Sequence, residues 1–321
     1  MAKGCNVTFG DPDGYADAIE KGGVKLTITG AGDFSAQLVR LKLKELVICR
    51  LRERLPRIAY ISLPSEQIFL SFPVGPRSLI LDGFVLRRGD IVFHSPDHHM
   101  HQRSNGECHW GLISLPLEQL AHYSKALTGR SIAIQEMSKI LSPTRPSRSR
   151  FHRLFREACH LAESKKRLIE RPEVARALEQ QLLHAIINCL TADQVIDSAK
   201  TRHRHAALMA RFETVLSRQI DQGLTLTTLC KEVGVPARTL RMCCSAFLGV
   251  GPMRYLTLRR LNNARAALRR ADPSTASVAG IARKHHFTEL GRFAVLYRTT
   301  FGELPSTTLQ MAARTVSAEI A

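Results

Sequence analysis

The carboxy-terminal third of the chain carries the same helical pattern twice. Within residues 206–310, three apolar positions repeat at an offset of 52 residues and four turn or core positions repeat at an offset of 53. The aligned positions are Leu226, Leu229 and Cys230 with Val278, Ile281 and Ala282, then Leu240, Leu248, Gly249 and Pro252 with Phe293, Phe301, Gly302 and Pro305. Each copy predicts a short helix, a turn, a second helix that ends at Gly, and a Pro soon after, which is the order of a helix-turn-helix.

The second helix of the first copy is predicted over 236–247, behind a supporting helix from Leu226 to Val233 and a turn at Gly234. Leu240 faces the core in this arrangement, and the outer face is left to Arg238, Thr239, Arg241, Met242 and Ser245. Arg pairs with guanine through two hydrogen bonds, and Met or Thr methyl groups contact thymine, so such a face can read bases in a major groove. The alternative is that Arg238 and Arg241 form a solvated face or neutralise phosphates.

The second copy places a supporting helix over Val278–Lys284 and a reading helix over Leu290–Phe301. Its outer face consists of Glu289, Arg292, Val295 and Arg298. Basic residues of the supporting helices are simpler to assign to phosphate contacts, namely Lys231, Arg283 and Lys284.

The segment 253–270 between the copies has helical spacing and is rich in Arg. At ~1.5 Å per residue it would span about 27 Å, close to the ~34 Å repeat of the DNA groove. One helix could therefore hold both reading helices in successive turns of the major groove, and we expect a single subunit to read a two-part site.

The charge of the chain suits a polyanionic partner. The net charge is +18 and the pI is near 10.1, and residues 205–314 alone contain 16 Lys or Arg against 6 Asp or Glu. A non-specific nucleic-acid packaging protein is an alternative that this charge permits, but the ordered repeat favours sequence-specific binding to double-stranded DNA.

Three motifs of the repeat resemble the AraC/XylS family of bacterial transcription regulators: LTLTTLC at 224–230, LGVGPMRYL at 248–256 and YRTTFGELPS at 297–306. The resemblance covers about a third of the chain. It implies an activator that binds two half-motifs near a promoter and contacts RNA polymerase, with an amino-terminal domain that senses a small-molecule effector or forms a homodimer. Two positions depart from the family pattern: His286 stands where Gly usually precedes Phe287, and Cys244 replaces a common Phe.

A chain of 321 residues is too long for one ordinary domain, and we expect an α+β protein with two domains. Short alternating segments predict a β region over about 24–116, and the periodicity then changes to that of helices over about 117–191. The resemblance implies that the β region is a small cupin-like barrel. We predict an effector-sensing and dimerisation domain at 1–198, a linker at 199–205 and a DNA-binding domain at 206–321.

Histidines are dense in and around the segment 89–105, and we choose His94, His101 and Trp110 as candidate effector-pocket residues. Histidines without a role, and a Trp that fills the core, are the alternatives. Imidazoles suit divalent metals, but a cupin metal site needs an earlier His-x-His strand and residues 24–88 contain no His. We therefore predict no metal, no cofactor and no catalytic residue, against the alternative of a metal-dependent cupin-like oxygenase or isomerase.

The amino terminus shows no secretory signal, and no run of about 18 apolar residues predicts a membrane span. The eight Cys lack the paired spacing of a zinc site or a redox couple, which favours reduced thiols. We expect a cytoplasmic, nucleoid-associated protein with no membrane partner.

Overall fold

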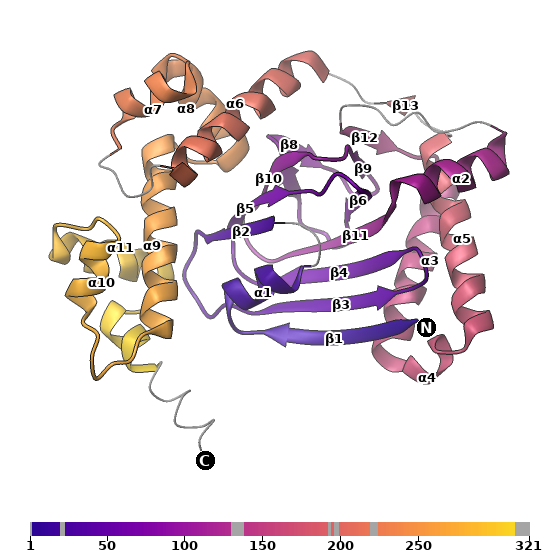
Figure 1. Ribbon diagram of the computed structural model, residues 1–321, viewed down its shortest axis with the longest axis horizontal. Coiled ribbons are helices and arrows are strands. Elements are labelled where there is room, and N and C mark those ends of the chain that lie inside the picture. The colour runs from indigo at the N-terminus through magenta and orange to yellow at the C-terminus, as the bar shows by residue number, and fades with distance from the viewer. Residues whose placement is uncertain are drawn as a thin grey trace.

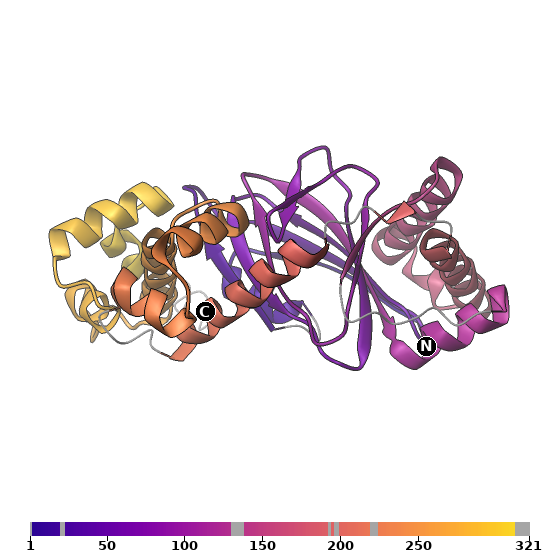
Figure 2. The same cartoon turned by 90° about the horizontal axis from the view of Figure 1, so that it is seen from above.

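The computed structural model describes residues 2–19, 23–129, 138–191, 194–195, 199–218 and 224–311. An amino-terminal domain of β-sheets is followed by a carboxy-terminal domain of helices, as the sequence predicts. The two lie side by side in Figures 1 and 2, with the helical domain against one edge of the sheets.

Two antiparallel sheets build the amino-terminal domain. The first has the order β1-β3-β4-β11-β6-β9-β12-β13 and the second has the order β2-β5-β10-β7-β8. The strands of the first sheet are β1 (Lys3–Phe9), β3 (Ala36–Lys42), β4 (Val47–Glu53), β6 (Gln67–Pro73), β9 (Ile91–His94), β11 (Cys108–Pro116), β12 (Lys139–Ser142) and β13 (Gln194–Val195). Those of the second are β2 (Gly23–Ile28), β5 (Arg57–Ser62), β7 (Leu79–Leu81), β8 (Phe84–Leu86) and β10 (His99–Ser104).

The barrel expected from the family resemblance is not what the described residues form, because the two sheets do not close on each other. The β region also extends beyond 24–116 on both sides, since β1 pairs with β3, and β12 pairs with β9. A core lies between the sheets, where Leu51 and Trp110 of the first sheet share an apolar cluster with Ala59 and Ile61 of the second.

Helices cover the outer face of the first sheet. Leu154 and Phe155 of α3 (Arg145–Ser164) and Leu182 of α5 (Pro172–Thr191) pack in one cluster with Val39 and Ile48 of the sheet. This cluster is the second core of the domain. The remaining helices of the amino-terminal domain are α1 (Pro12–Ala18), α2 (Leu117–Thr128) and α4 (Lys166–Ile169).

The carboxy-terminal domain contains α6 (Ala199–Arg218), α7 (Leu226–Val233), α8 (Ala237–Leu248), α9 (Pro252–Arg270), α10 (Val278–Lys284) and α11 (Leu290–Phe301). Segment 199–205, expected to be a linker, forms the first turns of α6. A polar sequence alone therefore does not indicate a linker. Here the polar residues form the start of a helix whose later residues Phe212 and Leu216 are buried in the core around α7 and α8.

The helical domain contacts the sheet domain at the edge strand β2. Asn262 of α9 accepts a hydrogen bond from Ile28 N at 2.9 Å and donates to Ile28 O at 3.0 Å, as a neighbouring strand would. An edge strand exposes unpaired backbone groups, so this amide side chain satisfies one residue of that edge.

Candidate nucleic-acid interface

The first helix-turn-helix is formed by α7 and α8. Thr225 begins α7, because its Oγ1 accepts a hydrogen bond from Thr228 N at 3.2 Å, and Gly234 ends it with φ of 74°. Gly249, with φ of 73°, ends α8. A residue with a side chain is strained at such φ values, which explains Gly at both ends.

The second unit, α10 and α11, repeats this construction with one difference. Ser277 caps α10 through a 3.0 Å hydrogen bond from Gly280 N, and Gly302 ends α11 with φ of 80°. The turn between the helices passes through His286, whose φ is 64°. His286 thus adopts the left-handed conformation that Gly would adopt without strain.

The sequence-predicted reading residues lie on the outer faces of α8 and α11. Leu240 and Phe293 are buried on the opposite faces, so the orientation of both helices matches the prediction. Met242 and Val295 are 51% and 65% exposed, so both side chains are accessible to a partner. Arg238, Arg241, Ser245, Glu289, Arg292 and Arg298 are exposed, and Thr239 is half-buried.

The cations proposed for phosphate contact, Lys231, Arg283 and Lys284, are also exposed. None of these three, and none of the Arg residues on the two reading faces, forms an ion pair with a carboxylate in the described part of the chain. Their charges therefore remain available to a polyanion.

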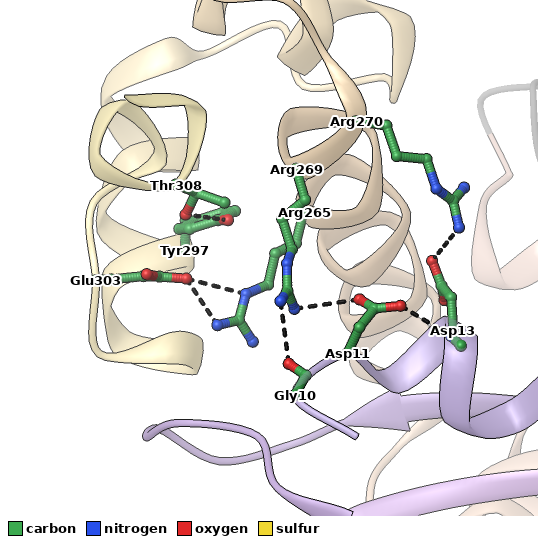
Figure 3. A network of polar contacts seen from close by, with 10 residues as sticks. Gly10, Asp11, Asp13, Arg265, Arg269, Arg270, Tyr297, Glu303 and Thr308 are labelled. Carbon is green, nitrogen blue, oxygen red and sulfur yellow. Dashed lines mark hydrogen bonds and ion pairs between the residues drawn. The ribbon is translucent and has the colours of Figure 1, made fainter. Parts of the chain in front are cut away.

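The arginines of the connecting helix α9 behave differently, because most of them pair inside the molecule. Arg265 contacts Glu303 at 2.7 Å. Arg269 contacts Asp11, the N-cap of α1, at 3.2 Å, and Arg270 contacts Asp13 in the first turn of α1 at 2.6 Å. Figure 3 shows this group of contacts at the meeting point of the two domains. The number of Arg residues in α9 therefore overstates the positive charge that this helix can offer to DNA.

A buried cluster around Glu213 of α6 joins the two domains. Its Oε1 accepts from Tyr255 OH at 2.8 Å and lies 3.0 Å from His101 Nε2 of β10, and its Oε2 lies 2.5 Å from Arg259 Nη1. Burial alone would raise the pKa of Glu213, but the hydrogen bonds from His101 and Tyr255 and the charge of Arg259 outweigh it and lower the pKa. Glu213 is therefore held as a carboxylate.

The three candidate effector residues do not share one pocket. His94 is buried with Nε2 2.7 Å from Ser71 Oγ, and His101 belongs to the Glu213 cluster at the domain contact. Trp110 alone lines the apolar cavity between the sheets, and its Nε1 donates to Glu53 Oε1 at 3.1 Å. That cavity has room for about 20 Å³, roughly one water molecule, in this conformation.

Sequence reasoning missed Glu213, Asn262, Asp11 and Asp13. A signal existed for Glu213, because a lone acid follows Phe212 on the apolar face that also carries Leu208, Met209 and Leu216. Asn262 and the two aspartates carried no comparable signal, since their partners lie far away in the sequence.

Within the described ranges, no three His, Cys, Asp or Glu side chains gather as a metal ion would require. In the same ranges no helix combines the length and the apolar character needed to cross a bilayer.

Comparisons with known proteins agree on the type of the carboxy-terminal domain. Residues 229–311 match the family model described as a helix-turn-helix domain. The probable thc operon regulatory protein of Rhodococcus erythropolis is 40% identical over 95 residues, which is 30% of this chain and 29% of that protein. The XylDLEGF operon transcriptional activator 2 of Pseudomonas putida is 33% identical over 96 residues, 30% of this chain and 61% of that protein.

Among solved structures, the AraC-like transcriptional activator CuxR is similar over 82% of this chain and 96% of its own, with 16% identity and a TM-score of 0.42. A probable AraC family transcriptional regulator from Rhodopseudomonas palustris CGA009 is similar over 33% of this chain and 96% of its own, with 30% identity and a TM-score of 0.30. The matched sequence relatives are thus aligned over less than two thirds of their own length, and the similarity concentrates in the repeat.

Proposed function

Because the carboxy-terminal third of this chain belongs to the AraC/XylS family of transcription regulators, we propose that the whole protein is a sequence-specific DNA-binding regulator that activates transcription. One observation carries the proposal. Two helix-turn-helix units are joined by a single helix, and each presents an outer face of exposed side chains with unpaired Arg.

The connecting helix sets the spacing of the two units. α9 has 19 residues and spans about 28 Å at ~1.5 Å per residue. Asn262 attaches it to β2, and the ion pairs of Arg259 and Arg265 attach it to Glu213 of α6 and to Glu303. We infer that one subunit places α8 and α11 in successive major-groove turns, where Arg241 and Arg292 read bases and Lys231, Arg283 and Lys284 contact phosphates.

The sheet domain is the proposed sensor. Along β10, Met100 and Gln102 line the cavity between the sheets, whereas His101 between them points the other way to Glu213 of α6. Side chains alternate along a strand, so a ligand that moves β10 would also move the contact with the helical domain. Such a ligand changes DNA binding only if it favours one arrangement of the two domains over the other.

The proposed setting follows from this role. The protein acts by binding and not by catalysis, in the cytoplasm at the nucleoid, with RNA polymerase as the partner at promoters and a second copy of the chain as a further partner.

The experiment is a selection of fragmented genomic DNA by the purified full-length protein at physiological salt, followed by sequencing of the retained fragments. We expect a motif in two halves about one helical turn apart, bound ~10³ times or more tighter than bulk DNA. Retention without any motif, with a steep dependence on salt, would instead identify a packaging protein.

A further inference from the structure

An open pocket lies on the sheet domain, far from the helix-turn-helix units. It has a volume of about 320 Å³ and is bounded by α3 and by the turn between β8 and β9. Its lining includes Arg88, Gly89, Arg148, His152, Phe155 and Arg156. In Figure 1, α3 stands at the end of the sheets opposite to α10 and α11.

The pocket gathers positive charge without a counter-charge. Arg148, His152 and Arg156 recur every four residues along one face of α3, and Arg88 approaches from the turn. No carboxylate lines the pocket, and among the described residues none pairs with these three arginines. On α9, by contrast, Arg259, Arg265, Arg269 and Arg270 each have a carboxylate partner.

The backbone at Gly89 leaves room for the side chain of Arg148. Gly89 has φ of 101°, and a Cβ at this position would collide with the side chain of Arg148, which lies across it. A residue with a side chain would therefore be strained at position 89 and would displace the side chain of Arg148. The close approach keeps the guanidinium of Arg148 at the pocket instead of in free solvent.

His152 provides a second observation at this pocket. Its Nε2 is buried and has no hydrogen-bond partner among the described residues. Burial, then the charges of Arg148, Arg156 and Arg88, lowers the pKa of His152 to about 4. A buried polar atom without a partner is costly, so the local structure gains from a group that can form a hydrogen bond with it.

We propose that this pocket binds a small organic anion that carries at least two negative charges on phosphate or carboxylate groups. Guanidinium groups bind both chemistries through paired hydrogen bonds, and three of them suit a polyanion better than a single charge. Pro73 and Phe155 provide an apolar wall for a carbon skeleton, and the volume lies within the range of small-molecule sites. The inference does not rest on the proposed DNA-binding function.

The test is calorimetric titration of the full-length protein with pyrophosphate and, separately, with citrate, and with acetate as a single-charge comparison. Saturable binding of pyrophosphate or citrate at one site per chain is expected, and the stronger of the two identifies phosphate or carboxylate chemistry. Arg148→Ala and Arg156→Ala should each weaken that binding by about tenfold or more. Arg153→Ala is the matched control, because Arg153 is exposed on α3 but does not line the pocket, and its effect should stay within about twofold.

Three outcomes would overturn the proposal: no saturable binding of either polyanion, binding of acetate as tight as that of the polyanions, or an equal loss in Arg153→Ala. Arg156 is exposed, so Arg156→Ala should fold even if Arg148→Ala does not. The fluorescence of Trp110 and the helical circular dichroism report folding of each variant. Arg148→Ala should still select the same DNA motif, which separates failure of this site from failure of the proposed function.

Discussion

His101 Nε2 lies 3.0 Å from Glu213 Oε1, and both side chains are almost fully buried although one belongs to β10 and the other to α6. Through Glu213 the contact extends to Tyr255 and Arg259 of α9, the helix that joins the two helix-turn-helix units. The sheet domain and the helical domain are therefore linked by a charged cluster that is largely shielded from water, where the loss of one partner costs stability.

Glu213→Gln tests this link. The substitution keeps the shape of the side chain but leaves Arg259 buried without its counter-charge, so we expect the free energy of unfolding to fall by about 3 to 5 kcal/mol. Trp110, the only Trp of the chain, lies in the sheet domain, and its fluorescence during denaturant unfolding should detect the change in the other domain. Glu232→Gln, at an exposed position of α7, is the control. An unchanged Trp110 transition in Glu213→Gln would mean that the domains are not coupled.

Asn262→Ala removes the side chain that pairs with the edge strand β2. The N–H and C=O of Ile28 would both lose their partner, and we expect a loss of about 1 to 3 kcal/mol in the free energy of unfolding. The neighbouring Asn263 is exposed, so Asn263→Ala should cost little. Equal losses in the two variants, measured by the same fluorescence transition, would argue against a specific role of Asn262.

His94 makes stability depend on pH. Burial, then the neighbouring His98, lowers the pKa of His94 to about 3, whereas its ordinary value is 6.5. Between these values the imidazole is protonated in the unfolded chain but not in the folded protein. The contribution of His94 to the free energy of unfolding is therefore fully present above about pH 6.5, and it falls by roughly 1 kcal/mol per pH unit below that pH. His152, with a pKa of about 4, acts in the same direction.

The measurement is denaturant unfolding of the native protein and of His94→Gln between pH 7 and pH 5. Gln does not titrate, so the variant should lose less stability over this interval than the native protein does. His160→Gln, at an exposed position of α3, should keep the native slope. If the slope of His94→Gln equals that of the native protein, another group is responsible.

His286→Gly should stabilise the second helix-turn-helix unit. His286 is exposed and has φ of 64°, a conformation that costs a residue with a Cβ about 1 kcal/mol or more and costs Gly none. We expect the free energy of unfolding to rise by up to about 1 kcal/mol. The helical circular dichroism signal, recorded during denaturant unfolding, measures this change. Thr299→Gly, at an exposed position inside α11, should instead lose about 0.3 kcal/mol, the difference between the helix propensities of Thr and Gly. A loss in His286→Gly would show that the side chain contributes more than the strain costs.

The sequence predicted the repeat well because its signals are local. Caps, glycines with positive φ and apolar spacing set α7, α8, α10 and α11, and the first reading helix, expected over 236–247, is observed at Ala237–Leu248. The turn at His286 was indicated by the family resemblance, because Gly usually stands at this position, and its φ of 64° is the conformation that Gly adopts.

The sheet domain was harder to predict because its structure depends on distant pairings. In β1 the apolar Cys5, Val7 and Phe9 alternate with the polar Asn6 and Thr8, which is a local strand signal that the prediction starting at about residue 24 left out, whereas its partner β3 lies some thirty residues away and no local pattern identifies it. Closure of a barrel depends on how non-neighbouring strands pair, which a periodicity cannot show. His94 and His101 are close in sequence, yet one contacts Ser71 inside the sheets and the other contacts Glu213 outside them.

The central claim is that one subunit reads two half-sites, one with each reading helix. The most direct test repeats the genomic DNA selection with Arg241→Ala and with Arg292→Ala. Each variant should bind the native motif about 1 to 3 kcal/mol more weakly and should lose base preference in one half of it only, with the two variants affecting opposite halves. Loss of preference in the same half for both variants, or a uniform loss on all sequences, would contradict the account.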